Sequence, residues 1–136
     1  MRVTLIAGLP GSGKTFLLRS MREDGATCID DIRGLSDLPR QRVPWLAISD
    51  VNFCRKDVRD AAEFEIARRF GPVDLEWTFF ENDPDQCRAN AVGRNDGRNV
   101  NADIDALCRL YVVPEDAKCI PVFGAQTSEA APILKS

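Results

Sequence analysis

The 136-residue chain contains no histidine. This absence excludes Ser-His and Cys-His nucleophile pairs, and it excludes any histidine-ligated metal centre. A general base in this protein must therefore be a carboxylate, a lysine or a water molecule. Long apolar runs are missing as well, because the run at residues 3–7 is too short for the core of a signal peptide or for a membrane span. We therefore expect a cytoplasmic protein with no membrane partner.

The cysteines form no recognisable motif. They are Cys28, Cys54, Cys87, Cys108 and Cys119, an odd number with wide spacing and no C-x-x-C pair. This pattern is typical of small buried thiols in a reducing compartment rather than of a metal or redox site. The formal net charge of −3 gives no overall attraction to nucleic acid or anionic lipid, although it is compatible with a local basic patch.

Apolar strands alternate with helices along the chain. We predict strands at residues 2–7, 26–29, 45–48, 75–80 and 119–123. We predict helices at residues 14–22, 56–70, 84–92 and 104–111. The second helix places Val58, Ala62, Ile66 and Phe70 on one stripe and ends at a Gly-Pro pair. The alternation implies an α/β fold, with a parallel sheet of four to five strands flanked by helices on both faces.

The remaining segments are irregular, and the chain reads as one domain. Residues 93–101 are too rich in glycine and asparagine to form a helix. Residues 125–136 read as a loose tail. A hydrophobic content of 44% supports a single core, and the chain has neither an internal repeat nor a linker. We therefore expect residues 1–136 to form a single domain.

Residues 8–15, GLPGSGKT, match the phosphate-loop pattern G-x-x-x-x-G-K-[ST] between a strand and a helix. The glycines allow the loop to wrap around a phosphate with its N–H groups inward, and the helix N-terminus adds a favourable dipole. Lys14 supplies a point charge for the β- and γ-phosphates, and the Thr15 hydroxyl is placed to bind Mg²⁺. The motif predicts a P-loop NTPase fold that binds ATP and Mg²⁺. The expected nucleotide-binding residues are Gly8, Leu9, Pro10, Gly11, Ser12, Gly13, Lys14, Thr15 and Phe16.

Acidic residues follow the next two predicted strands. The carboxyl ends of parallel strands meet at one edge of a sheet, so Asp30-Asp31 and Asp50 should gather beside the phosphate loop. Asp50 has the position of a Walker B acid, and we expect it to hold Mg²⁺ together with Thr15. Without histidine, Asp30 is the natural base for an acceptor hydroxyl opposite the γ-phosphate. Arg33, close behind, is placed to grip an acceptor phosphate or the transferring group.

These motifs resemble those of the P-loop polynucleotide 5′-hydroxyl kinases, the bacteriophage enzyme among them, and of related small P-loop kinases. The likeness rests on G-x-P-G-S-G-K-[ST] at residues 8–15, on D-D-x-R at residues 30–33 and on I-S-D-x-N at residues 48–52. It extends over residues 2–113. The resemblance implies transfer of a phosphoryl group from ATP to a hydroxyl, with Asp30 as general base and Arg33 on the reactive phosphate. It also implies a mobile lid whose arginine stabilises the transferring group.

The lid arginine is one of several candidates. Arg88, Arg94 and Arg98 all lie near the implied position, and we expect the loop carrying Arg94 and Arg98 to close over the nucleotide. A guanidinium suits this role because the transferring phosphoryl group needs a planar partner with several donors. We assign the catalytic roles to Lys14, Asp30, Arg33, Arg94 and Arg98.

The acceptor is less clearly indicated. The family carries a longer segment between Arg33 and the next strand, whereas residues 34–44 of this chain are short and supply only Arg40 and Arg42 for contact with a polyanion. A polynucleotide or nucleotide 5′-hydroxyl is the first interpretation. The alternatives are a small-metabolite kinase and a nucleotide-binding regulatory or assembly ATPase.

Overall fold

The structure, a computed structural model, describes residues 1–31, 37–94 and 100–124, without the side chains of residues 93 and 94. Its strands form one five-stranded parallel sheet in the order β2-β3-β1-β4-β5. The strands are β1 (Arg2–Ala7), β2 (Thr27–Asp30), β3 (Trp45–Ser49), β4 (Asp74–Phe80) and β5 (Lys118–Ile120). The predicted α/β class and the parallel sheet are confirmed.

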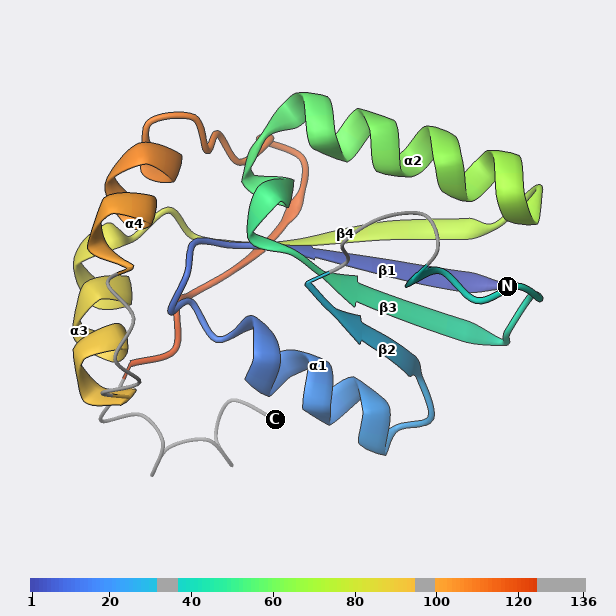
Figure 1. Cartoon of the computed structure of the whole chain (residues 1–136), viewed down its shortest axis with the longest axis horizontal. Helices are drawn as coiled ribbons and strands as arrows, with labels where there is room; N and C mark the ends of the chain where they lie inside the picture. The colour runs from blue at the N-terminus through green and yellow to red at the C-terminus, as the bar shows by residue number, and fades with distance from the viewer. Residues whose placement is uncertain (32–36, 95–99, 125–136) are drawn as a thin grey trace.

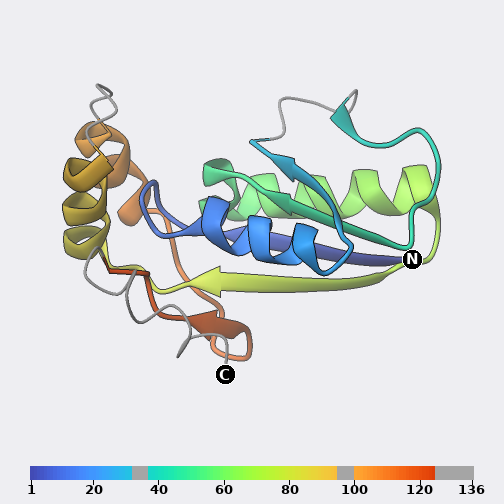
Figure 2. The same ribbon diagram turned by 90° about the horizontal axis from the view of Figure 1, so that it is seen from below.

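Helices cover both faces of the sheet and its carboxyl edge. They are α1 (Lys14–Glu23), the short η2 (Val51–Cys54), α2 (Lys56–Phe70), α3 (Pro84–Arg94) and α4 (Asn101–Cys108). Helix α1 lies on one face and α2 on the other, while α3 and α4 lie side by side beyond the carboxyl ends of the strands (Figure 1, Figure 2). Within the described part of the chain, no helix combines the length and the apolar character that crossing a membrane requires.

Two apolar clusters hold these layers together. Side chains alternate across a strand, so Phe79 of β4 joins the cluster under α2, whereas Phe80 joins the cluster under α1. The predicted stripe of α2 faces the first cluster: Ile66 and Phe70 are buried, and the two stripe residues before them pack against its edge. The predicted stripe therefore lies on the face of α2 that packs against the sheet.

The structure corrects several element boundaries near the site. Helix α3 continues to Arg94, and Asn101 already belongs to α4, so both ends of the segment predicted as irregular are helical. Helix α4 ends at Cys108 rather than at Tyr111, whose hydroxyl is drawn into the core to donate to the carbonyls of Ala7 and Phe80. Strand β5 ends at Ile120, because the chain after it leaves the sheet for the phosphate loop. Residues 95–99 and 125–136 lie outside the described residues.

Candidate functional site

The phosphate loop connects the central strand β1 to α1, as predicted. Gly11 and Gly13 have φ angles of 85° and 112°, a backbone region that side chains disfavour. A Cβ at Gly11 would lie 2.5 Å from the carbonyl oxygen of Cys87, and a Cβ at Gly13 would lie 2.6 Å from the ring of Phe123. Glycine is therefore required at both positions for two reasons: the backbone conformation disfavours a side chain, and the neighbouring segments leave no space for one.

Lys14 lies inside this loop. Its Nζ donates hydrogen bonds to the carbonyls of Gly8 at 2.9 Å and Leu9 at 2.8 Å, and only 7% of the residue is exposed. Burial lowers the pKa of Lys14, whereas the carboxylates of Asp31 and Asp30 are among the groups that act in the opposite direction. The loop therefore encloses a basic side chain within its own backbone, which is an arrangement suited to binding a polyphosphate.

The acids at the end of β2 lie beside the first turn of α1. The hydroxyl of Thr15 donates to Asp30 Oδ2 at 3.0 Å, and the hydroxyl of Ser49 donates to Asp30 Oδ1 at 2.9 Å. Asp31 has a positive φ of 58°, and its N–H donates to the carbonyl of Ser49 at 2.8 Å. The expected meeting of strand ends thus occurs. Ser49 belongs to the I-S-D-x-N motif at the strand end expected here, but no role was predicted for it, although its place at the end of β3, in register with Asp30, was a usable signal.

Asp50, the predicted Walker B acid, is buried at the end of β3. Its carboxylate accepts from the N–H of Asn52 at 2.8 Å, which caps η2. Desolvation raises the pKa of Asp50, and Lys14 is among the groups that oppose the shift. Thr15 and Asp50, expected to hold Mg²⁺ together, lie at the same edge of the sheet, but the carboxylate bonded to Thr15 is Asp30.

The donor set fits a magnesium ion that arrives with a nucleotide. Within residues 1–31, 37–94 and 100–124, no cluster of three or more His, Cys, Asp or Glu side chains could hold a metal ion by itself. Mg²⁺ is commonly bound through one or two protein oxygens together with substrate phosphates. A hydroxyl and neighbouring carboxylates beside a phosphate loop meet that requirement.

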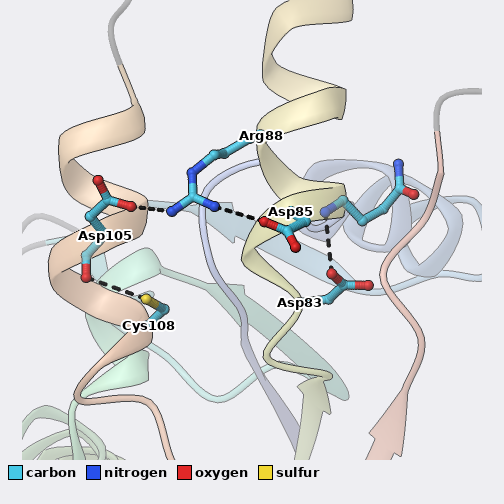
Figure 3. Close-up of polar contacts among 6 residues, drawn as sticks. Asp83, Asp85, Arg88, Asp105 and Cys108 are labelled. Atoms are coloured by element: carbon cyan, nitrogen blue, oxygen red, sulfur yellow. Dashed lines mark hydrogen bonds and ion pairs between the residues drawn. The ribbon is translucent and has the colours of Figure 1, made fainter.

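The candidate lid arginines separate into two groups. Arg88 forms ion pairs with Asp85 of its own helix at 3.0 Å and with Asp105 of α4 (Figure 3). It therefore joins α3 to α4, which is a structural role that the sequence did not distinguish. Arg94 is the last residue of α3, and its side chain is outside the described part of the chain, as are Arg98 and Arg33.

Arg42 lies at the opposite end of the molecule from the phosphate loop. Its guanidinium donates to the carbonyl of Phe70 and, at 3.2 Å, to the carbonyl of Pro72, where α2 ends and β4 is about to begin. The amino ends of parallel strands lie away from the edge that carries the phosphate loop. Arg42 thus stabilises the end of a helix and does not belong to the acceptor side of the site.

Asn90 and Phe123 contact the outside of the phosphate loop, and no sequence pattern predicted these contacts. The amide of Asn90 in α3 donates to the carbonyl of Gly11 at 2.8 Å and to the carbonyl of Phe123, whose own N–H donates to Ser12 at 3.1 Å. The ring of Phe123 makes edge contacts with Phe16 and with Phe80, with centroid distances of 5.2 and 5.7 Å. No sequence motif marks Phe123, because the contacts join segments that are distant in the chain.

The comparisons with known proteins agree with this fold. The structure is similar to the crystal structure of a gluconokinase from Sinorhizobium meliloti 1021, with a TM-score of 0.63 and 10% sequence identity, covering 98% of this chain and 89% of that one. At this identity the likeness establishes the fold alone, and it confirms the predicted α/β class.

Sequence comparison gives the family. No protein-family model matches the chain. It is, however, 31% identical over 105 residues to Uncharacterized protein R277 of Acanthamoeba polyphaga mimivirus, and the match covers 71% of this chain and 75% of the viral protein. Identity at this level over such a share of both proteins indicates common descent. The chain therefore belongs to the same protein family as this mimivirus protein, and it has the α/β fold of the gluconokinase.

Proposed function

We propose that this chain is an ATP-dependent phosphotransferase that moves the γ-phosphate of ATP to a hydroxyl acceptor. The observation that carries the proposal is the meeting of the phosphate loop with the acids of β2, through the hydrogen bond from Thr15 to Asp30. The fold that the chain shares with a gluconokinase supports it. A phosphate loop alone indicates nucleotide binding, whereas a carboxylate beside the loop adds a group that can accept a proton.

The loop binds the triphosphate through its backbone N–H groups, and Lys14 exchanges the carbonyls of Gly8 and Leu9 for phosphate oxygens. Thr15 and Asp50 would hold the Mg²⁺ of the nucleotide, which supplies neutralising charge on the β- and γ-phosphates. The side chains of Lys14 and Thr15 thus fix the γ-phosphate at the carboxyl edge of the sheet, next to Asp30.

In the reaction, the acceptor oxygen attacks the γ-phosphorus in line with the bond to the leaving group. The new O–P bond forms, the bond between the γ-phosphorus and the bridging oxygen breaks, and ADP leaves. Asp30 takes the proton of the acceptor hydroxyl, and Ser49 and Thr15 hold its two oxygens in place. Arg33, Arg94 and Arg98 are proposed to stabilise the charge on the transferring phosphoryl group.

Among the described residues, the charges at the ends of β2 and β3 favour a small compound over a polynucleotide as the acceptor. The ends of β2 and β3 place Asp30, Asp31 and Asp50 together, and Asp31 is among the groups that raise the pKa of Asp50. Carboxylates repel a phosphate-rich polymer, while they accept hydrogen bonds well from the hydroxyls of a polyol. Arg42 is engaged at the far end of α2. A polynucleotide or nucleotide 5′-hydroxyl remains the second candidate, supported by the D-D-x-R motif.

A panel of acceptors tests the proposal. Purified protein with γ-labelled ATP and Mg²⁺ is incubated with polyols, sugars, sugar acids, nucleosides and oligonucleotides bearing a 5′-hydroxyl, and Lys14→Ala serves as the inactive control. Label transfer to a polyol or sugar supports the small-molecule reading, and transfer to the oligonucleotide supports the second candidate. ATP hydrolysis that no acceptor changes would instead indicate a regulatory or assembly ATPase.

A further inference from the structure

The side chain of Asn90 connects the phosphate loop to α3, which carries it, and to the segment after β5 that contains Phe123. It belongs to α3, and its Nδ2 donates to the carbonyl of Gly11 at 2.8 Å and to the carbonyl of Phe123. Its Oδ1 accepts from Nε2 of Gln86, one helical turn earlier, at 3.0 Å. An amide nitrogen carries two hydrogens and a carbonyl carries none. The two carbonyl partners therefore fix which end of the amide faces the loop.

The loop is held from its carbonyl side. The carbonyl of Gly11 accepts from Asn90, and the carbonyl of Ser12 accepts from the N–H of Phe123 at 3.1 Å. Peptide units are planar, so a carbonyl fixed on one side directs the N–H of the same unit to the other side. The N–H of Ser12, in the unit that Asn90 holds, donates within the loop to the carbonyl of Leu9 at 3.1 Å, and the N–H of Gly13, in the unit held by Phe123, is directed away from Phe123. Donors on the carbonyl side thus fix the path of the loop that would cradle a phosphate.

Contacts around Asn90 leave this arrangement little freedom. The backbone of Cys87, one turn before Asn90, closely approaches Gly11, and the ring of Phe123 closely approaches Gly13. Asn90 joins these two contacts, because one amide group bonds to the loop and to the Phe123 segment at once. The loop is therefore seated between α3 and the segment after β5.

We infer that Asn90 is a positioning residue for triphosphate binding: it holds the phosphate loop, from α3, in the conformation that binds the phosphate. This inference rests on the proposed function, because it concerns the same nucleotide site. The amide of Asn90 is bonded to the carbonyls of Gly11 and Phe123, so its effect on binding passes through these two residues. Asn90→Asp is the informative variant, since it keeps the shape of the side chain and turns a carboxylate oxygen toward two carbonyl oxygens.

Asn82 offers a matched control. Its amide also donates to two carbonyls, those of Cys108 at 2.9 Å and Tyr111 at 3.0 Å, but neither belongs to the phosphate loop. Asn82→Asp therefore imposes the same chemical change on a similar two-carbonyl contact. Affinity for a non-hydrolysable ATP analogue with Mg²⁺ is measured by calorimetry for the wild type, Asn90→Asp, Asn90→Ala and Asn82→Asp. Hydrogen exchange of residues 8–14 is measured on the same proteins without nucleotide.

We expect both Asn90 variants to bind the analogue about three- to tenfold more weakly, as the net contribution of one hydrogen bond implies. We also expect faster exchange in residues 8–14 of these variants, and wild-type behaviour of Asn82→Asp in both measurements. Wild-type affinity and exchange in Asn90→Asp and Asn90→Ala would overturn the inference, and so would an equal loss in Asn82→Asp. A wild-type protein that binds no triphosphate would refute the proposed function itself, and with it the role of Asn90 in binding. Asn90→Ala keeps the test decisive if the aspartate variant does not fold.

Discussion

The hydroxyl of Thr15 donates a hydrogen bond to Asp30 across 3.0 Å, which joins the first turn of α1 to the end of β2. Thr15 is the last residue of the phosphate-loop motif, and Asp30 is the first acid of the D-D-x-R motif. The bond therefore places the residue proposed to accept the proton in direct contact with the loop proposed to bind the phosphates. Ser49 completes the arrangement by donating to the second oxygen of the same carboxylate at 2.9 Å.

Asp30→Asn tests this relationship directly. The change keeps the size of the side chain but removes the group that accepts the proton, so phosphoryl transfer should fall by roughly 10²–10⁴-fold. Binding of ATP should survive, because Lys14 and the loop are intact. Asp31→Asn is the matched control and should have a smaller effect, because Asp30 is the acid whose carboxylate accepts from Thr15 and Ser49. A loss of ATP binding in Asp30→Asn, without a further loss of turnover, would assign Asp30 to structure or to the metal shell.

Lys14→Ala should abolish turnover and greatly weaken triphosphate binding. The variant removes the cation enclosed by the loop and its hydrogen bonds to the carbonyls of Gly8 and Leu9. Calorimetry with an ATP analogue measures the affinity. Lys56→Ala is the control, because Lys56 pairs with Asp60 on the exposed surface of α2 and should bind the analogue like the wild type. Unchanged affinity in Lys14→Ala would refute the assignment of the phosphate loop.

Arg94→Ala and Arg98→Ala, made separately, should leave ATP binding within a few-fold of the wild type. At least one of them should reduce turnover by more than roughly tenfold, which corresponds to about 1.4 kcal/mol of activation free energy. The reason is that the transferring phosphoryl group gains charge that a guanidinium can stabilise. Steady-state kinetics with saturating ATP measures the effect. Two fully active variants would show that neither Arg94 nor Arg98 takes part in the mechanism.

Arg88→Ala should behave differently from these two variants. Arg88 is held by Asp85 and Asp105, so its loss should loosen the contact between α3 and α4 and lower the melting temperature slightly. Turnover should stay within a few-fold of the wild type. Thermal unfolding and the kinetic assay above measure both quantities. A large loss of turnover at an unchanged melting temperature would show that Arg88 acts on the nucleotide instead.

The buried thiols predict an alkaline loss of stability. Burial raises the pKa of Cys54 to about 12 and that of Cys87 to about 11, from an ordinary value of 9.0. Above about pH 9 the thiols of the unfolded chain ionise while those of the folded chain stay protonated, so the free energy of unfolding decreases as pH rises. Cys54→Ala should be less stable than the wild type at pH 7, and the difference should narrow above about pH 9. A stability difference between the wild type and Cys54→Ala that stays the same at every pH in thermal unfolding would contradict this prediction.

The sequence determined the sheet and the phosphate loop by itself. The loop pattern, the strand before it and the helix after it are local in the chain, and the stripe of Val58, Ala62, Ile66 and Phe70 predicted the face of α2 that packs against the core. The gathering of Asp30 and Asp50 at one edge also followed from sequence, because parallel strands end at the same edge of a sheet.

Only the tertiary structure decided which side chains meet. Asn90 and Gly11 are 79 positions apart, and no local pattern says that an amide on α3 reaches that carbonyl. No local pattern predicts the packing of Phe123 against Gly13 or the ion pair of Arg88 with Asp105. The hydrogen bond from Arg42 to the end of α2 is equally non-local. Charge and periodicity describe what a residue can contact, whereas packing between distant segments selects the partner. The sequence thus predicted the chemistry of the candidate site, and the fold decided which residues support it.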